Sequence, residues 1–417
     1  MINRRSKAER RGNHRGTGRA RSQRSNVTVE QTITARSFRQ MSHGNRSRTA
    51  KKGKVRYAVV GLGHIAQTAV LPAFAHASKN SALVALVSGD QSKGEQLQRK
   101  YKVPQAISYD EYDSFLDSGD VDAVFIAEPN SLHRNFSVRA AEAGVHVLCE
   151  KPLAVTEDEC QQMIQAARRN GVKLMTAYRL HFEKANLEAI ELVHSGKIGE
   201  PRFFSSVFGM QAKDGNIRLQ KKMGGGTLYD LGVYCINAAR YLFRSEPVEV
   251  TAFTANSGEK RFREVEEMIG AMLRFPGERL ATFICSFGSA DTAAYDLIGT
   301  KGTLHVKNAY EYAMPVEWEL AIEGKVQSRK FPRRDQFGPE LVYFSNCILK
   351  NKEPEPSGVE GLNDVHIVRA LYQSANNGTP VRLKNLQKKE YPGTRQEITR
   401  PPVKKPKQVR AENPTKD

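Results

Sequence analysis

Hydrophobic positions in the first part of the chain form short runs that are separated by segments of helical periodicity. The runs lie at residues 55–60 (VRYAVV), 82–87 (ALVALV), 121–127 (VDAVFIA), 145–149 (VHVLC) and 173–177. Helix-like segments follow the first four runs: one reaches Phe74, one spans 92–101, one reaches Ala143 and one spans about 157–169. Strands that alternate with helices predict right-handed βαβ units and a parallel sheet, the α/β class of fold.

The pattern changes after about residue 180. An amphipathic helix at 186–195 precedes an extended run at 202–208, and a glycine run at 224–226 opens a helix that reaches Phe243. Strand-like segments then follow with little helix between them, at 248–255, 268–275, 280–287, 295–299 and 303–306, before two helices at 339–350 and 359–376. Strands in series predict a second, α+β domain with an antiparallel or mixed sheet.

The composition is that of a globular chain of two or three domains. Hydrophobic residues make up 39% of the 417 residues, and no apolar run approaches the roughly 18 residues of a membrane-spanning helix. The five cysteines are scattered and form no C-x-x-C pair. This spacing argues against a disulfide framework or a metal site, and it favours a reducing compartment.

The net charge of +19 belongs to the two ends of the chain. Residues 1–54 hold 16 Lys and Arg against 2 Asp and Glu, residues 384–417 hold 10 against 4, and the body between them holds 38 against 39. A nearly neutral body needs no specific nucleic acid or membrane as its partner. We expect a basic disordered arm at 1–54 and a basic disordered tail at 384–417, both simply solvated, with nonspecific nucleic-acid contact as the alternative.

The N-terminal arm begins with Arg4-Arg5, as a twin-arginine export signal would. No apolar segment follows, so we expect a cytoplasmic protein. The start codon is misassigned in the alternative, since Met41 lies much closer to the first strand, and a periplasmic protein is then the alternative location.

The motif Gly61-x-Gly63-x-x-Ala66 lies between the first predicted strand and the first helix. The first glycine permits the tight turn, the second lets the backbone approach a pyrophosphate, and Ala66 lets the helix pack against the strand. Amide groups at the helix N-terminus would bind the phosphates. The predicted dinucleotide loop is therefore Gly61, Leu62, Gly63, His64, Ile65 and Ala66. A purely structural turn is the alternative, and His64 is interpreted as incidental to the chemistry.

The end of the second predicted strand indicates which dinucleotide binds. NAD enzymes usually place Asp or Glu there to hold the ribose 2′-hydroxyl. This chain has Ser88 directly after the ALVALV run and Lys93 at the start of the next helix. A small hydroxyl beside a cation suits a 2′-phosphate, so NADP is favoured over NAD. In the alternative, Asp90 binds the ribose.

Three residues are candidates for catalysis. Lys151 follows the fourth strand, at the sheet edge where doubly wound folds bind ligands. Asp230 and Tyr234 stand four residues apart in a predicted helix and therefore share a face. A nearby lysine and a cofactor cation would let Tyr234 accept a proton from a substrate hydroxyl, while Asp230 binds a neighbouring hydroxyl. The alternatives are a surface lysine before a turn, a core tyrosine and a surface aspartate.

Over about residues 55–383 the chain resembles the Gfo/Idh/MocA oxidoreductases, and within them the glucose–fructose oxidoreductases. The resemblance rests on the segments YAVVGLGHIA, ALVSGDQSK, EPNSLH, CEKPLAV, YRLHF and GGGTLYDLGVYCINAARYLF. It implies a Rossmann domain at 55–178 that binds NADP. It also implies an α+β domain at 179–383 with an open, mostly antiparallel sheet. This domain would bind a sugar or polyol and mediate a homo-dimer or tetramer.

The resemblance further implies roles for single residues. Lys151 and Tyr234 would be catalytic, Asp230 would help to bind the sugar, and Ser88 and Lys93 would hold the NADP phosphate. Positions of the cofactor pocket are matched by Tyr109, Asn130, His133, Glu150 and Arg179. Segments that line the sugar pocket contain His181 and Arg218.

We therefore expect an NADP-dependent oxidoreductase that transfers hydride between nicotinamide and a sugar or polyol. The alternative from another class is a sensor or regulator of the same fold that binds dinucleotide or sugar without turnover. The joint presence of Lys151, Asp230 and Tyr234 favours catalysis. Among enzymes, a dehydrogenase that exchanges its cofactor competes with an enzyme that oxidises one sugar and reduces another at one site.

Overall fold

The structure is a computed structural model, and it describes residues 53–384 and 390–415. The predicted N-terminal arm lies outside the described residues except for its last two positions. The first element of the two described ranges is the first predicted strand, and the elements and contacts named are those of residues 53–384 and 390–415.

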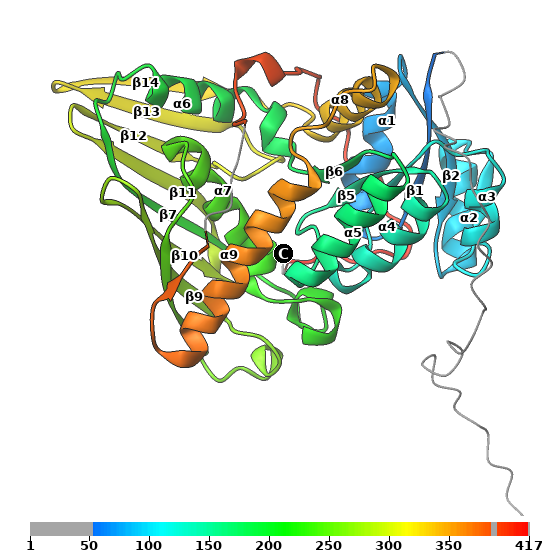
Figure 1. The fold of residues 1–417 in the computed structure, drawn as a ribbon, viewed down its shortest axis with the longest axis horizontal. Coiled ribbons are helices and arrows are strands. Elements are labelled where there is room, and N and C mark those ends of the chain that lie inside the picture. Colours follow the sequence, from blue (N-terminus) through cyan, green and yellow to red (C-terminus); the bar gives the residue numbers. More distant parts are fainter. Residues whose placement is uncertain (1–52, 385–389, 416–417) are drawn as a thin grey trace, which may run out of the picture. The chain divides into compact units, whose positions relative to one another are not determined.

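The first domain is built on a six-stranded parallel sheet (Figure 1). Its strands are β1 (Val55–Val60), β2 (Ser81–Val87), β3 (Gln105–Ile107), β4 (Ala123–Ile126), β5 (His146–Glu150) and β6 (Leu174–Ala177). They lie in the order β3-β2-β1-β4-β5-β6, so the chain changes direction across the sheet between β1 and β4. In open α/β sheets this switch point leaves a crevice at the carboxyl ends of the strands, where ligands bind.

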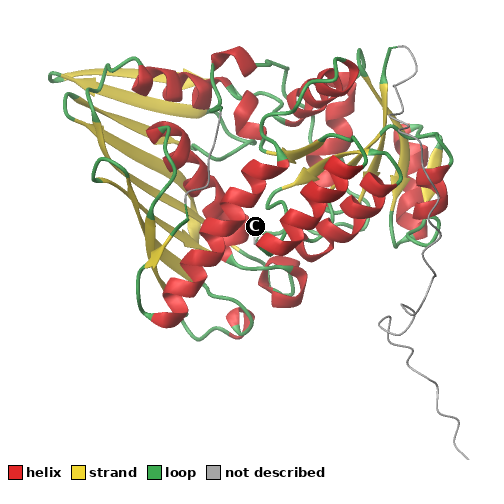
Figure 2. Ribbon diagram, in the orientation of Figure 1, coloured by secondary structure: helices red, strands yellow, loops and turns green. Residues whose placement is uncertain are grey.

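Helices cover both faces of this sheet, as the alternating pattern predicted (Figure 2). They are α1 (Leu71–Ala77), α2 (Gln91–Tyr101), α3 (Tyr112–Asp117), α4 (His133–Glu142) and α5 (Glu157–Arg169), with a π-helical turn at Ala66–Val70 before α1. The short elements β3 and α3 were not predicted, because three- and six-residue elements are too short to show a period.

A late helix, α8 (Phe337–Leu349), also belongs to this layer. Figure 1 shows α8 beside α1, and the Tyr57 hydroxyl in β1 lies 2.9 Å from the Ser345 hydroxyl in α8. Its apolar side chains, with Phe344 fully buried, join the core under β1 and β2. The second domain was predicted to span residues 179–383. Within this range, α8 packs against the sheet of the first domain.

The second sheet has nine strands, and most neighbours are antiparallel. The strands are β7 (Pro201–Gln211), β8 (Glu249–Ala255), β9 (Met268–Phe275), β10 (Arg279–Ser286), β11 (Gly288–Gly299), β12 (Gly302–Lys307), β13 (Val316–Ile322), β14 (Lys325–Phe331) and β15 (Val381–Arg382). Their order is β14-β13-β12-β11-β7-β10-β9-β8-β15, with β7 and β10 parallel. The open, mostly antiparallel sheet is as predicted.

Helices cover one face of the nine-stranded sheet and leave the other face bare (Figure 2). The covering helices are α6 (Lys184–His194), α7 (Val233–Phe243) and α9 (Gly358–Asn377). Along β9 buried and less buried residues alternate, which is the period-two signature of a strand with one face in the core. No helix within the described ranges is long and apolar enough to cross a membrane.

The C-terminal segment differs from the expected disordered tail. Residues 390–415 lie against the body and contain little regular structure apart from a 3₁₀ turn at Thr394–Gln396. The Ile398 amide donates to the Phe182 carbonyl at 3.3 Å, and Arg400 Nε donates to the His76 carbonyl at 3.1 Å. Further on, the Val409 amide donates to Gln67 Oε1 at 2.8 Å. These contacts are made largely by backbone groups, so charge and hydropathy did not reveal them.

Candidate active site

A cavity of about 880 Å³ lies at the carboxyl ends of β1, β2, β4 and β5. Its other walls are residues 208–234 and 310–312 of the second domain, residues 333–337 before and in α8, and part of the C-terminal segment. A cavity of this size falls within the usual range of sites for small molecules and cofactors. It also lies at the switch point of the parallel sheet, where the sequence placed the site.

The glycine loop lies in one wall of the cavity, and glycine is suited to its two positions for different structural reasons. Gly61 has φ +90°, and a Cβ there would lie 2.6 Å from the Ala127 carbonyl oxygen, so no larger residue fits the turn. A Cβ on Gly63 would meet nothing within 4 Å, so the space over this residue is open. Ala66 lies buried behind the loop, where it lets the helix pack against β1, as predicted.

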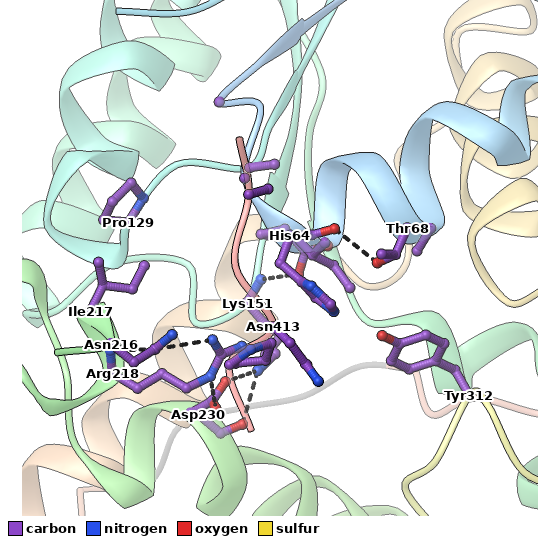
Figure 3. Close-up of a pocket in the computed structure, with 18 of the residues that line it drawn as sticks. His64, Thr68, Pro129, Lys151, Asn216, Ile217, Arg218, Asp230, Tyr312 and Asn413 are labelled. Carbon is purple, nitrogen blue, oxygen red and sulfur yellow. Dashed lines mark hydrogen bonds and ion pairs between the residues drawn. The ribbon is translucent and has the colours of Figure 1, made fainter. Parts of the chain in front are cut away.

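His64 projects from this loop into the cavity wall (Figure 3). Burial, together with the positive charges of Arg218 and Lys405, lowers its pKa to about 4. The imidazole is therefore neutral at pH 7. Its Nδ1 atom lies 2.8 Å from Nε2 of Gln408 in the C-terminal segment.

The carboxyl end of β2 carries the residues predicted to choose the dinucleotide. Ser88 is buried, and its hydroxyl accepts a hydrogen bond from the Asp90 amide at 3.1 Å. Asp90 caps α2 by accepting from the Lys93 amide at 3.0 Å. Because its carboxylate is engaged in this cap, Asp90 is less available for a ribose hydroxyl. Both Ser88 and Lys93 line the cavity.

Tyr109 covers the end of the same pocket. A Cβ on Gly89 would lie 2.8 Å from the Tyr109 ring, so the glycine allows the ring to approach the backbone. The Tyr109 hydroxyl donates to Glu128 at 2.6 Å, and burial raises the pKa of Glu128 to about 7. Tyr109 therefore lies in the predicted cofactor pocket.

Lys151 and Asp230 form the centre of the site. Lys151 Nζ donates to both the carbonyl and the Oδ1 atom of Asp230, each at 2.9 Å, and Arg218 Nε donates to Oδ2 at 2.5 Å (Figure 3). Burial opposes the charged form of Asp230, but Arg218 and Lys151 outweigh it and hold its pKa below the ordinary range. Burial also opposes the charge on Lys151, yet Asp230 and Tyr234 outweigh it and its pKa is raised. Asp230 and Lys151 therefore both stay ionised at neutral pH.

Tyr234 lies between two cations. Lys151 Nζ and the Arg179 guanidinium are each 4.9 Å from the centre of its ring, and Arg179 Nε donates to the Tyr234 hydroxyl at 3.2 Å. Arg179 is itself buried and held by Gln336 and the Tyr310 carbonyl. Fixed cations beside a phenol stabilise negative charge that develops on its oxygen.

Local structure explains why Asp230 and Tyr234 reach the same cavity. Asp230 lies in a π-helical turn (Leu228–Gly232), a feature frequent at functional sites, and Tyr234 lies at the start of α7. The glycine run before this turn packs closely, since a Cβ on Gly225 would lie 2.3 Å from the Arg218 carbonyl oxygen. The close approach brings Arg218 to Asp230.

A buried ion cluster fixes the other end of α7. Arg240 is fully buried and lies 2.6 Å from Asp364 and 2.7 Å from Glu360, both in α9. Removal of one partner would leave buried charge uncompensated, so these contacts hold α7 in one position.

Other predicted residues lie at the wall of the cavity. Glu150 ends β5, and burial raises its pKa to about 7, although Lys151 partly offsets the effect. Asn130 lines the cavity and donates to the Gly224 carbonyl at 2.8 Å. His133 is buried, with its ring nitrogens 2.8 Å from the carbonyl oxygens of Pro152 and Glu128, so it braces the loops after β4 and β5.

His181 is the predicted residue that the structure does not bring to this cavity. It is buried beside a second, much smaller cavity, with its ring packed against Tyr241. Arg179–Phe182 is a single tight 3₁₀ turn, so Arg179 faces the main cavity while His181, two residues on, faces away. His181 therefore does not line the main cavity, and its predicted place in a sugar pocket stays a prediction.

Several lining residues were missed because they come from loops far apart in the sequence. They include Asn216, Tyr310, Tyr312, Lys405, Arg410 and Asn413, some of which Figure 3 labels. No spacing rule links these segments, so the sequence carries no signal for them. Within the described residues, no group of His, Cys, Asp or Glu has the arrangement of a metal site.

Comparison with known proteins agrees with this geometry. Residues 55–178 match a family model described as an oxidoreductase family with an NAD-binding Rossmann fold, and residues 186–305 match the GFO/IDH/MocA C-terminal domain. A D-xylose 1-dehydrogenase [NADP(+)] of Haloarcula marismortui is 31% identical over 80% of this chain and 95% of its own length.

Solved structures are also similar. An aldose–aldose oxidoreductase from Caulobacter crescentus, crystallised with glycerol, has 38% sequence identity and a TM-score of 0.75 over 79% of this chain and all of that one. A 3-ketoreductase from Actinomadura kijaniata, in complex with NADP and TDP-benzene, has 27% identity and a TM-score of 0.70 over 77% of this chain and 98% of that one.

Proposed function

Because the chain belongs to the Gfo/Idh/MocA oxidoreductases, we propose that it transfers hydride between NADP and a hydroxyl or carbonyl carbon of a sugar. The convergence of Lys151, Asp230 and Tyr234 at one end of a cavity that also contains the glycine loop carries this proposal. A sensor that only binds its ligand has no need of a proton acceptor between two fixed cations.

The residues present fit the dinucleotide. The open space over Gly63 is where a pyrophosphate would approach the backbone, and Ser88 with Lys93 would hold the 2′-phosphate. Glu150, Lys151 and Arg179 line the far end, which would contain the nicotinamide. A bound nicotinamide supplies the redox chemistry by accepting or giving a hydride.

The protein would supply position and proton transfer. Lys151 Nζ would donate a hydrogen bond to the reacting hydroxyl of the sugar, and the Tyr234 oxygen would take the proton of that hydroxyl as its carbon is oxidised. In the reverse direction the Tyr234 hydroxyl would return the proton. Asp230, oriented by Arg218, would accept a hydrogen bond from a neighbouring sugar hydroxyl.

For the finer activity we propose a glucose–fructose oxidoreductase-like reaction, in which one sugar is oxidised and another is reduced at the same site. The 38% identity to a structure named as an aldose–aldose oxidoreductase supports this choice. We would denature the purified protein and measure NADP and NADPH by mass spectrometry, then incubate the native protein with sugar pairs without added cofactor. Turnover under these conditions supports the one-site reaction, and turnover only with added NADP identifies a dehydrogenase.

The enzyme itself is tested by nicotinamide absorbance with a panel of aldoses and polyols. Sugar-dependent formation or consumption of NADPH is expected. If NADP and a sugar both bind but no hydride moves with any sugar of the panel, the regulator hypothesis takes its place.

We also propose that the bare face of the nine-stranded sheet mediates a homo-oligomer. Exposed apolar side chains gather there on neighbouring strands: Phe203, Val207, Phe253, Met272 and Ile284. Phe253 is 76% exposed, and contiguous apolar patches of this kind usually mark an interface. Light scattering should show a dimer or tetramer in the wild type, and Phe253→Lys with Ile284→Asp should convert it to a smaller species. An unchanged mass would refute the assignment of this face.

A further inference from the structure

The last part of the described chain crosses the active-site cavity from one domain to the other. We call residues 403–415 the C-terminal strap. On the first domain, Val409 exchanges two hydrogen bonds with the Gln67 side chain, both 2.8 Å. On the second domain, the Lys213 amide donates to the Pro414 carbonyl at 2.9 Å and Thr415 pairs with Ala212. The strap is therefore tied to both walls of the cavity.

The strap is part of the cavity wall. Its lining residues are Val403, Lys405, Arg410, Ala411, Glu412, Asn413, Pro414 and Thr415. Neither family match includes these residues, since the two matches end at 178 and 305. The family pattern therefore does not assign the strap a role.

The order of contacts along the strap follows the dinucleotide loops. Gln408 Nε2 lies 2.8 Å from His64 Nδ1 in the glycine loop, and Lys405 lines the cavity together with this loop. Two residues further on, Arg410 Nη1 lies 3.4 Å from Asp90 Oδ1, beside Ser88 and Lys93. The strap thus places one cation at the pyrophosphate loop and another at the ribose end.

Arg410 is suited to bind an anion at that end. Its side chain is 58% exposed, and its long contact with Asp90 leaves the guanidinium free to turn into the cavity. A planar guanidinium binds a phosphate through two parallel hydrogen bonds, which a lysine cannot do.

We propose that the strap forms the outer wall of the NADP site and that Arg410 binds the 2′-phosphate together with Ser88 and Lys93. This inference rests on the proposed function. Because the strap is tied to both domains over the cavity, it would have to open before the dinucleotide could leave. A strap of this kind would retain the cofactor between successive sugars.

The first test uses the full chain with Arg410→Ala, Arg410→Lys and the matched control Lys407→Ala. Arg410 has φ +44°, and alanine carries the same Cβ, so the backbone strain is unchanged. Lys407 has the same charge, lies three residues away and does not line the cavity. We would measure the Kd of NADP and of NAD by calorimetry at one fixed salt concentration.

A hydrogen-bonded charge is worth about 1.5–3 kcal/mol, so Arg410→Ala should raise the Kd of NADP roughly 10- to 150-fold. In Arg410→Ala the Kd of NAD should rise less than about 3-fold. The Kd of NADP for Arg410→Lys should lie between those of the wild type and Arg410→Ala, and that for Lys407→Ala should equal the wild-type value. Equal losses for NADP and NAD, or equal effects of Arg410→Ala and Lys407→Ala, would overturn the assignment. If the wild type binds no NADP, the proposed function itself fails, and this outcome is distinct.

The second test asks whether the strap closes over the bound dinucleotide. Trypsin can cut the strap after Lys404, Lys407 and Arg410, and mass spectrometry follows each cut, with sites in residues 1–54 as the internal reference. Saturating NADP should slow the strap cuts relative to the reference. Faster cutting would mean that the strap and the dinucleotide compete for the same space, and unchanged cutting would mean that the dinucleotide does not affect the strap. Either result would refute closure of the strap over the dinucleotide.

Discussion

Replacing Tyr234 by phenylalanine removes one oxygen from the centre of the cavity and leaves the ring in place. The ring keeps its contacts with Phe208 and Tyr310, whose centres lie 5.6 and 6.0 Å away, and it stays beside Lys151 and Arg179. The hydrogen bond from Arg179 Nε is lost. The substitution therefore isolates the proton-transfer role from packing.

The expected loss follows from that role. A positioned acid–base group contributes about 10²–10⁴-fold to the rate. Turnover should fall by about this factor, which corresponds to an activation barrier raised by about 2.7–5.4 kcal/mol. The lost hydrogen bond comes from the charged, buried Arg179 guanidinium and is worth about 1.5–3 kcal/mol of folding stability. The Kd of NADP should barely change, because the proposed binding groups for its phosphates are the Gly61 loop, Ser88 and Lys93, away from Tyr234.

The assay is single-turnover hydride transfer under saturating NADP and sugar, followed at the nicotinamide absorbance. Tyr295→Phe is the matched control, because Tyr295 is equally aromatic, 2% exposed and outside the lining of the main cavity. The control should keep normal turnover. Lys151→Ala should cost as much as Tyr234→Phe or more, and the double variant should lose less than the product of the two, since the pair acts on one hydroxyl.

Near-normal turnover in Tyr234→Phe, with chemistry shown to be rate-limiting, would refute the reasoning. So would a double variant whose loss equals the product of the single losses, because two independent residues would then be acting at different steps.

Three further predictions concern the cofactor end. Ser88→Asp with Lys93→Ala should reverse the preference for NADP over NAD, because an acid replaces a hydroxyl and a cation is lost. Equal use of NAD and NADP by the unmutated protein would contradict the predicted preference. Burial raises the pKa of Glu150 to about 7 in the folded protein, against about 4.3 when unfolded, so the wild type loses stability as pH rises through this interval. The free energy of unfolding of Glu150→Gln, measured in urea, should therefore rise relative to that of the wild type from pH 5 to pH 8. A difference between the two proteins that does not change with pH would contradict a raised pKa for Glu150. Gly61→Ala should lower the melting temperature, because its Cβ would collide with backbone at 2.6 Å, whereas Gly63→Ala should fold normally and only weaken NADP; identical melting temperatures would contradict the distinction.

The sequence by itself determined the parallel sheet and the ends of its strands. The apolar runs gave β1, β2, β4, β5 and β6, and each predicted cofactor residue at a strand end lines the cavity or, for Ala66, packs behind it. The physical reason is that a βα loop is continuous in sequence, so the groups that bind a ligand stay next to the strand that positions them. The roles of the individual residues stay predictions until the variants are measured.

Contacts between distant segments were decided only by the tertiary structure. The pairing of Lys151 with Asp230 and the bond from Arg179 to Tyr234 join residues 79 and 55 positions apart, which no periodicity could link. His181 faced away because a 3₁₀ turn rotates neighbours to different sides. The tail from residue 390 is polar and basic, yet its backbone amides and carbonyls find partners on both domains, and hydrogen bonds of the backbone leave no trace in composition.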